Sequence, residues 1–285
     1  WDRTSLGGAN PFNLKVGSGA QGAQTARILE GYEQILLSSP RPRGVIVVGD
    51  VTSTMACALA AAKLCVPVAH VEAGLRSGDR TMPEEINRIV TDALSDVLLV
   101  SDPDGLMHLA REGQPREKIA FVGNIMVDTL HAELPLAQKS TLLNELGLRP
   151  GEYLYVTLHR PSNVDDPVVL KRLVGLLTEF SRAVPLVFSL HPRTRERLAE
   201  AAIPLPESPQ FRVIPPLGYR DNLRMIQCAK MVLTDSGGIQ EETSALNVPC
   251  LTLRDTTERP ITVTLGSSEL VGNDAGRIRE AWGRF

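Results

Sequence analysis

This sequence has few aromatic residues, few cysteines and no long apolar segment, and each scarcity argues against a class of protein. The cysteines, Cys57, Cys65, Cys228 and Cys250, are scattered without a CxxC pair among apolar neighbours, as is typical of buried thiols in a reducing compartment. There is no signal peptide and no apolar run long enough to span a bilayer, so we expect a cytoplasmic protein without a membrane partner. The net charge is −3 and no basic cluster stands out, which gives no support for a nucleic-acid partner.

Apolar residues are plentiful and recur in a strand-helix alternation. They make up 43% of the 285 residues, enough for one large or two medium cores. A strand at 44–48, an alanine-rich helix at 52–64 and a strand at 66–71 form the first βαβ unit, and the pattern resumes after Arg149-Pro150-Gly151. We therefore predict an α/β protein with two Rossmann-like parallel-sheet domains, at 1–133 and 134–285, with the boundary region near 131–152.

Acidic residues follow the first two expected strands, at the end of a parallel sheet where ligands bind. Asp50 comes just after the first strand, where an aspartate also commonly caps the next helix. Glu72 ends the second strand and, with His70, places an ionisable pair in an otherwise buried run. Because a buried charge must be paired or take part in chemistry, Glu72 is the stronger candidate.

A third carboxylate, Glu84, opens the next helix. Its spacing from Thr81 predicts a capping box, and Arg88 lies one helical turn further on, where it can pair with Glu84. These structural explanations stand beside a functional one, in which the loop after Glu72 brings Glu84 into an acidic cluster.

The second half contains LTDSGGIQEE, from Leu233 to Glu242, in which a buried strand meets the start of a helix predicted at 239–246. Asp235-Ser236-Gly237-Gly238 offers backbone N–H groups at the positive end of the helix dipole, where phosphate oxygens fit. Two carboxylates facing such a phosphate would repel it, so at least one must point elsewhere and can accept hydrogen bonds from sugar hydroxyls. A capped helix start with acids favoured by the dipole explains the segment equally well.

Histidine and arginine also follow strands in this half. His159-Arg160 and His191-Pro192-Arg193 have no cysteine or acidic residue at metal-ligand spacing, so we expect no metal site. A phosphate-facing or proton-transfer role and a hydrogen-bonded core histidine both remain open. The loop from Arg254 to Pro260 can hold phosphate or lie in solvent.

Together these motifs resemble the non-hydrolysing UDP-N-acetylglucosamine 2-epimerases, in the expected order over about residues 16 to 275. The matching segments are GDVTSTMACALAAAKLCVPVAHVEAGLRSG from Gly49, MPEEINRIVTDALSD from Met82, VGN from Val122, HRPSN from His159, HP at His191, LTDSGGIQEE and RDTTERP. The resemblance implies a glycosyltransferase-B-like fold with the nucleotide sugar in a central cleft. It implies a UDP-sugar substrate, a homodimer and no cofactor or metal.

The resemblance also implies roles for single residues. The acid/base carboxylates fall on Asp50, Glu72 and Glu84, the catalytic histidine on His159 and an active-site arginine on Arg88. The expected nucleotide contacts are Ser236, Gly237, Gly238, Glu242 and Arg259, with His191 nearby. Relative to the family pattern both ends look truncated, and Pro161-Ser162 replaces an acidic residue. A nucleotide-sugar-binding protein with impaired turnover and a glycosyltransferase of the same fold are therefore the alternatives.

Overall fold

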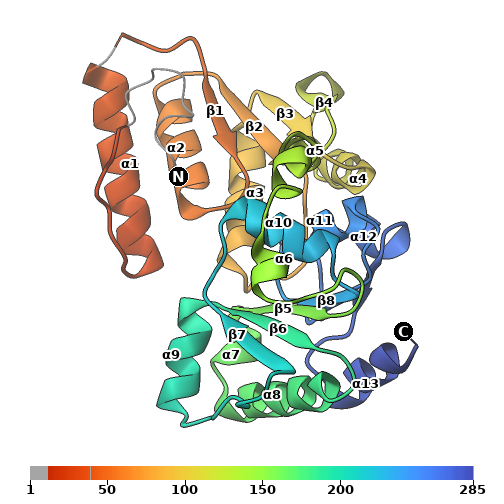
Figure 1. Ribbon diagram of the computed structural model, residues 1–285. Coiled ribbons are helices and arrows are strands. Elements are labelled where there is room, and N and C mark those ends of the chain that lie inside the picture. Colours follow the sequence, from red (N-terminus) through yellow and green to blue (C-terminus); the bar gives the residue numbers. More distant parts are fainter. Residues whose placement is uncertain (1–11, 39, 285) are drawn as a thin grey trace. The chain divides into compact units, whose positions relative to one another are not determined.

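The computed structural model describes residues 12–38 and 40–284, so residues 1–11 of the glycine-rich start lie outside the described part. The chain divides into two compact units, one up to Gly123 and the other from Asn124 (Figure 1). The domain boundary predicted from the sequence, between residues 133 and 134, falls inside a helix of the second unit, Ile125–Ala137. Within the described ranges, every helix is too short or too polar to pass through a lipid bilayer.

The first unit contains a four-stranded parallel sheet in the order β1-β2-β3-β4. Each strand is joined to the next by a crossover that contains a helix, as parallel pairing requires. Its elements in chain order are α1 (Gln21–Ser38), β1 (Val45–Val48), α2 (Thr52–Lys63), β2 (Val68–Ala73), α3 (Pro83–Leu94), β3 (Val97–Val100), α4 (Pro103–Arg111), the 3-10 helix η2 (Arg116–Lys118) and β4 (Ile119–Phe121).

Among the described residues of this unit, apolar side chains cover one face of the sheet well and the other face poorly. Val45, Val47 and Val68 pack against α1 and α2, whose alanines allow close approach to the strands. The alternate residues of β1 point the other way, and Ile46 and Val48 are 71% and 50% exposed. The first unit therefore has a small core on one side of its sheet.

The second unit has a six-stranded parallel sheet in the order β10-β9-β8-β5-β6-β7. Its strands are β5 (Leu154–Leu158), β6 (Leu186–Leu190), β7 (Phe211–Ile214), β8 (Met231–Thr234), β9 (Cys250–Thr252) and β10 (Ser268–Leu270). Its helices are α5 (Ile125–Ala137), α6 (Leu142–Glu145), α7 (Pro161–Val164), α8 (Pro167–Ser181), α9 (Pro192–Glu200), α10 (Tyr219–Gln227), α11 (Gly237–Ala245), α12 (Ile261–Thr264) and α13 (Ala275–Gly283). Strand order reverses between β5 and β8, which makes their carboxyl ends a topological switch point where ligands bind.

Apolar clusters cover both faces of this second sheet. Residues from α8, α9 and α13 pack on one face, and residues from α6 and α10 pack on the other. All residues of β6, β8 and β9 are buried, which explains why these strands read as continuous apolar runs. The two parallel-sheet α/β units confirm the predicted fold class.

Candidate active site

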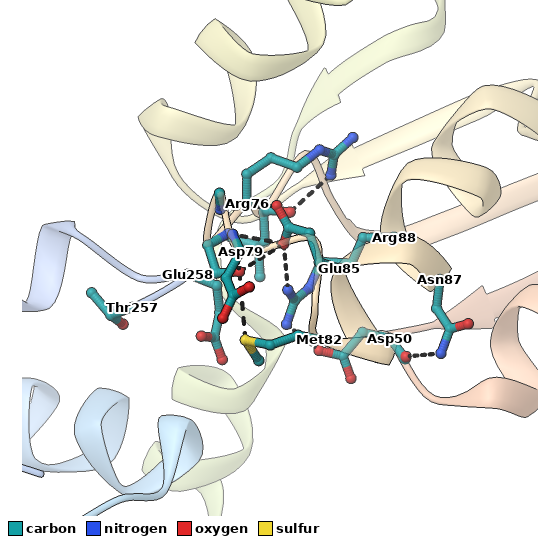
Figure 2. Close-up of polar contacts among 12 residues, drawn as sticks. Asp50, Arg76, Asp79, Met82, Glu85, Asn87, Arg88, Thr257 and Glu258 are labelled. Carbon is teal, nitrogen blue, oxygen red and sulfur yellow. Dashed lines mark hydrogen bonds and ion pairs between the residues drawn. The ribbon is translucent and has the colours of Figure 1, made fainter. Parts of the chain in front are cut away.

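Asp50 lies directly after β1 and is held at several atoms. Its carboxylate pairs with Arg88, and its backbone carbonyl accepts a hydrogen bond of 2.8 Å from the side-chain amide of Asn87 (Figure 2). Both partners come from α3, so one helix fixes both the backbone and the carboxylate of Asp50.

The inner stripe of α3 is polar. Glu85, Arg88 and Asp92 recur at intervals of three and four residues, which places them on one face, and all three are buried. Glu85 accepts hydrogen bonds from the backbone N–H groups of Ser77 and Gly78, at 2.9 and 3.0 Å, and pairs with Arg88 at 3.0 Å. Glu85 therefore ties the loop after β2 to α3.

The predicted capping box at Thr81 is wrong. Pro83 occupies the first helical position, Met82 is the N-cap without a side-chain cap bond, and the Thr81 hydroxyl donates to Asp79 instead. The predicted Glu84–Arg88 pair is also absent among the described residues, because Arg88 bonds with Glu85 and Asp50. Glu84 lies half-buried in the first turn of α3.

Glu72 interrupts the regular pairing of β2. Its φ angle is 69°, a left-handed conformation that is rare for residues other than glycine, and the register with β3 shifts between Val71 and Ala73. Such a bulge redirects a side chain at the end of a strand and is common next to active sites. The half-buried Glu72 and Asp50 thus lie at the carboxyl ends of the adjacent strands β2 and β1.

In the second unit, α11 begins at the carboxyl end of β8, two residues earlier than predicted. Ser236 is the N-cap, and its hydroxyl accepts from the N–H of Ile239 at 3.4 Å. A Cβ atom at Gly237 would lie 2.8 Å from Glu258 Oε1 and 3.0 Å from Arg259 Nη1, so a larger residue there would require these side chains to shift. The N-terminus of α11 thus has backbone donors, the Arg259 guanidinium and the Glu258 carboxylate close to Gly237.

Arg259 belongs to a buried chain of ion pairs. Its Nη1 lies 2.7 Å from Glu258, and its Nε lies 2.7 Å from Glu241. The other oxygen of Glu258 bonds with Arg254 at 2.7 Å, and the other oxygen of Glu241 accepts from Asn124 at 2.7 Å. These partners fix the guanidinium beside Gly237. Of the two neighbouring acidic residues of α11, Glu241 pairs with Arg259 and Glu242 does not.

His159 follows β5 and pairs with Asp235, which follows β8. The two atoms His159 Nδ1 and Asp235 Oδ1 are 2.9 Å apart, and Asp235 also accepts from the backbone N–H groups of His159 and Arg160 and from Asn163. Burial would raise the pKa of Asp235, but the bond from His159 and these other donors lower it below its ordinary value. With a proton held on Nδ1 by the carboxylate, Nε2 is the ring atom that can exchange a proton.

His191 has a structural function. Its Nδ1 accepts from the N–H of Arg193 and caps α9. Its ring centroid lies 5.4 Å from that of His159, and burial together with the charge of His159 lowers the pKa of His191. His191 thus favours the neutral form beside His159.

Glu242 is a buried carboxylate near a phenol. Burial raises its pKa to about 7, against the opposing effect of the hydrogen bond from Tyr219. Burial and the charge of Glu242 raise the pKa of Tyr219 to about 12. Glu242 therefore changes charge near neutral pH. One of its carboxylate oxygens can accept a hydrogen bond from a hydroxyl group.

The first unit thus brings Asp50, Glu72 and Arg88 to one sheet edge, with Glu84 in the adjoining helix turn. The second unit brings His159 and the residues from Ser236 to Gly238 to its switch point, with Arg259 beside Gly237. No group of three or more histidine, cysteine or acidic residues within 12–38 and 40–284 is arranged to hold a metal ion.

Comparisons with known proteins show which family the chain belongs to. A sequence model of the UDP-N-acetylglucosamine 2-epimerase family matches residues 7–285. The chain is 42% identical over 283 residues to the UDP-N-acetylglucosamine 2-epimerase of Methanocaldococcus jannaschii, covering 95% of this chain and 76% of the relative. The chain belongs to the UDP-N-acetylglucosamine 2-epimerase family. The family and the enzyme class predicted from the sequence are therefore confirmed.

One further relative and one solved structure extend the comparison for this epimerase-family chain. It is 42% identical over 273 residues to the UDP-2,3-diacetamido-2,3-dideoxy-D-glucuronate 2-epimerase of Pseudomonas aeruginosa, covering 95% of this chain and 75% of the relative. It superposes with a TM-score of 0.90 and 41% identity on the crystal structure of the M. jannaschii epimerase in complex with UDP-GlcNAc and UDP, covering 99% of this chain and 79% of that one. The similarity thus extends over both units.

Sequence reasoning missed several residues that hold this epimerase site together. Glu85 and Asp92 form the inner stripe of α3, and their spacing from Arg88 was the available signal. Asp235 directly follows a buried strand, as Asp50 does. Glu258 gave no such signal, because its partners Arg254 and Arg259 flank it in a loop that equally suits solvent.

Proposed function

We propose that this chain catalyses the reversible epimerisation at C2 of UDP-N-acetylglucosamine to UDP-N-acetylmannosamine. The observation that carries the proposal is that each unit, taken by itself, holds a different kind of chemical group. Carboxylates gather at the sheet edge of the first unit, and a helix N-terminus with a buried arginine beside it lies in the second. The M. jannaschii relative at 42% identity supports the same substrate.

The chemistry requires both kinds of group. The proton on C2 has no neighbouring carbonyl and is not acidic enough for direct removal. Breaking the anomeric C–O bond to UDP gives oxocarbenium character, which acidifies this proton and lets a carboxylate remove it, leaving a glycal. Re-addition of UDP with protonation on the opposite face inverts C2.

We assign the proton transfers at C2 to Asp50, Glu72 and Glu84. Asp50 and Glu72 lie at the ends of adjacent strands, and the Arg88 guanidinium holds the carboxylate of Asp50 in place. Glu84 is a member of this group because of its place in the family motif and in the first turn of α3. A structure with the UDP-sugar bound will show which carboxylate acts on which face of the sugar at C2.

We assign the departing diphosphate to the second unit. The N–H groups at the start of α11 and the guanidinium of Arg259 stabilise the negative charge that develops on UDP. His159, oriented by Asp235, can exchange a proton with a diphosphate oxygen through Nε2. Glu242 accepts a ribose hydroxyl.

The similarity to the P. aeruginosa enzyme supports a second candidate substrate. At 42% identity, it is as similar to this chain as the M. jannaschii enzyme is. UDP-2,3-diacetamido-2,3-dideoxy-D-glucuronate undergoes the same inversion at C2, and it differs by an amide at C3 and a carboxylate at C6. The acid/base and diphosphate assignments are unchanged for this substrate.

Proton NMR in D₂O tests the proposal directly. Each UDP-sugar is incubated with the purified chain, and the C2 proton signal and the epimer ratio are followed. We expect deuterium to enter C2 and two epimers to equilibrate, faster for the true substrate. Binding without exchange would contradict the proposal and support the impaired binding protein, whereas release of UDP with free sugar would indicate a hydrolysing enzyme.

A homodimer and a cytoplasmic location stay predictions, which light scattering and cell fractionation test.

A further inference from the structure

We propose that the buried pair His70–Asp92 positions Asp50 and Glu72 for proton transfer at C2. The inference rests on the proposed function and adds two residues to it. Neither residue is assigned to the substrate, and both are fully buried. Their role follows from the backbone groups that they bind.

His70 lies in β2, two residues before Glu72, and bonds at both ring nitrogens. Nε2 lies 2.9 Å from the backbone oxygen of Gly49, the residue before Asp50. Nδ1 lies 2.6 Å from Oδ1 of Asp92. A carbonyl oxygen and a carboxylate are both acceptors, so the ring must donate from both nitrogens.

The second oxygen of Asp92 reaches the other strand end. It accepts from the N–H of Gly74 at 3.1 Å, just after the bulge at Glu72, and it pairs with Arg76 at 2.7 Å. Arg76 is held in turn by both oxygens of Glu112 on the flank of α4. Asp92 therefore has a partner at each of its two carboxylate oxygens.

The pair thus connects two backbone segments that carry proposed catalytic carboxylates. Through Gly49 it fixes the turn that presents Asp50, and through Gly74 it fixes the bulge that presents Glu72. Because a reacting group must be placed within a fraction of an ångström, removing such support lowers turnover more than substrate affinity. A misplacement of about 1 Å caused by a change away from the reacting atoms can cost about 100-fold in rate.

A glutamine at position 70 tests the requirement for two donors. An amide has one donor nitrogen and one acceptor oxygen, so His70→Gln leaves either Gly49 or Asp92 without its bond. The double variant His70→Gln with Asp92→Asn restores a complementary set, because asparagine can donate to the glutamine oxygen. The matched control is Asp96→Asn, since Asp96 accepts from the N–H of Val68 at the opposite end of β2, at 3.0 Å.

The experiment measures kcat and KM for deuterium exchange at C2, UDP affinity by calorimetry and thermal unfolding for each variant. We expect His70→Gln to lower kcat about 10-fold to 100-fold with KM and UDP affinity within about twofold, partial recovery in the double variant, and no loss of kcat in Asp96→Asn. If His70→Gln does not fold, the double variant is compared with Asp92→Asn for the same recovery.

Unchanged kcat in His70→Gln, or a double variant no faster than the single variants, would overturn the positioning role while leaving the epimerase intact. If the wild-type chain fails to exchange C2, the proposed function itself is wrong and the inference falls with it. A loss of thermal stability without a loss of kcat would show that the pair serves folding alone.

Discussion

The two units support their site residues by different means. In the second unit, apolar clusters cover both faces of a six-stranded sheet, and its central strands are buried throughout. In the first unit, one face of a four-stranded sheet is partly exposed, and the buried stripe of α3 is made of charged and polar residues. The first site edge is therefore held by hydrogen bonds and ion pairs over a small core, whereas the second combines buried ion pairs with apolar clusters on both faces of its sheet.

This difference has a consequence for mutational sensitivity. Apolar cores lose stability in proportion to the volume removed, and they tolerate volume-conserving changes. A buried charged network fails when a single partner is removed, because the remaining charge keeps its desolvation cost. We expect the removal of a buried charged partner to matter in either unit, and the truncation of a core side chain to cost more stability in the second unit than in the first.

The largest effect is expected for Asp50→Asn. Asparagine cannot take up the C2 proton, and general acid–base catalysis typically contributes about 10²-fold to 10⁴-fold. Deuterium exchange at C2 should fall by that factor, while UDP affinity measured by calorimetry stays within about twofold. Near-normal exchange would show that the acid/base assignment is wrong.

A pair of apolar truncations tests the difference between the two sheets. Leu233 in β8 is 1% exposed, whereas Ile46 in β1 is 71% exposed. Leu233→Ala should lower the free energy of unfolding by about 2–5 kcal/mol, and Ile46→Ala should change it by no more than about 0.5 kcal/mol. Urea unfolding followed by circular dichroism gives both values, and equal losses would refute the contrast in burial.

The pH dependence of stability tests the burial of Glu242. Because its pKa is raised from 4.5 to about 7 in the folded chain, its stabilising contribution is complete below pH 4.5 and is lost as pH rises through 7. The wild type should lose up to about 3 kcal/mol relative to Glu242→Gln across this window. Chemical unfolding of both proteins at pH 5 and pH 8 measures the difference, which should be constant if Glu242 is well solvated.

The smallest effect is expected for Arg259→Ala on UDP binding. Losing a charge-assisted hydrogen bond costs about 1.5–3 kcal/mol, which corresponds to a roughly 10-fold to 100-fold weaker complex by calorimetry. Arg279→Ala is the matched control, since Arg279 pairs with Glu179 at 2.8 Å on the surface of the same unit and should leave UDP affinity unchanged. Equal UDP affinities for the wild type, Arg259→Ala and Arg279→Ala would show that Arg259 does not bind the diphosphate.

Periodicity and strand ends predicted the sheets well, because parallel strands bring their carboxyl ends to one edge. Position alone made Asp50 and Glu72 candidates, whereas their acid/base roles came from the family resemblance and stay predictions. The start of α3 was misjudged because Pro83 fixes the first helical position and overrides the Thr81 cap signal. The ion pairs of Arg259 were not predictable, since Glu241 lies in another element and long-range pairing leaves no local pattern.

At the bulge of Glu72, the stability of the fold and the proposed activity favour different residues. A left-handed backbone costs about 1–3 kcal/mol in a residue other than glycine, so Glu72→Gly would relieve strain while deleting a carboxylate. If Glu72 serves as proposed, we expect a screen for thermal stability to select that glycine and a screen for epimerase activity to reject it. The glutamate at position 72 thus indicates that selection for activity has outweighed selection for stability at this position.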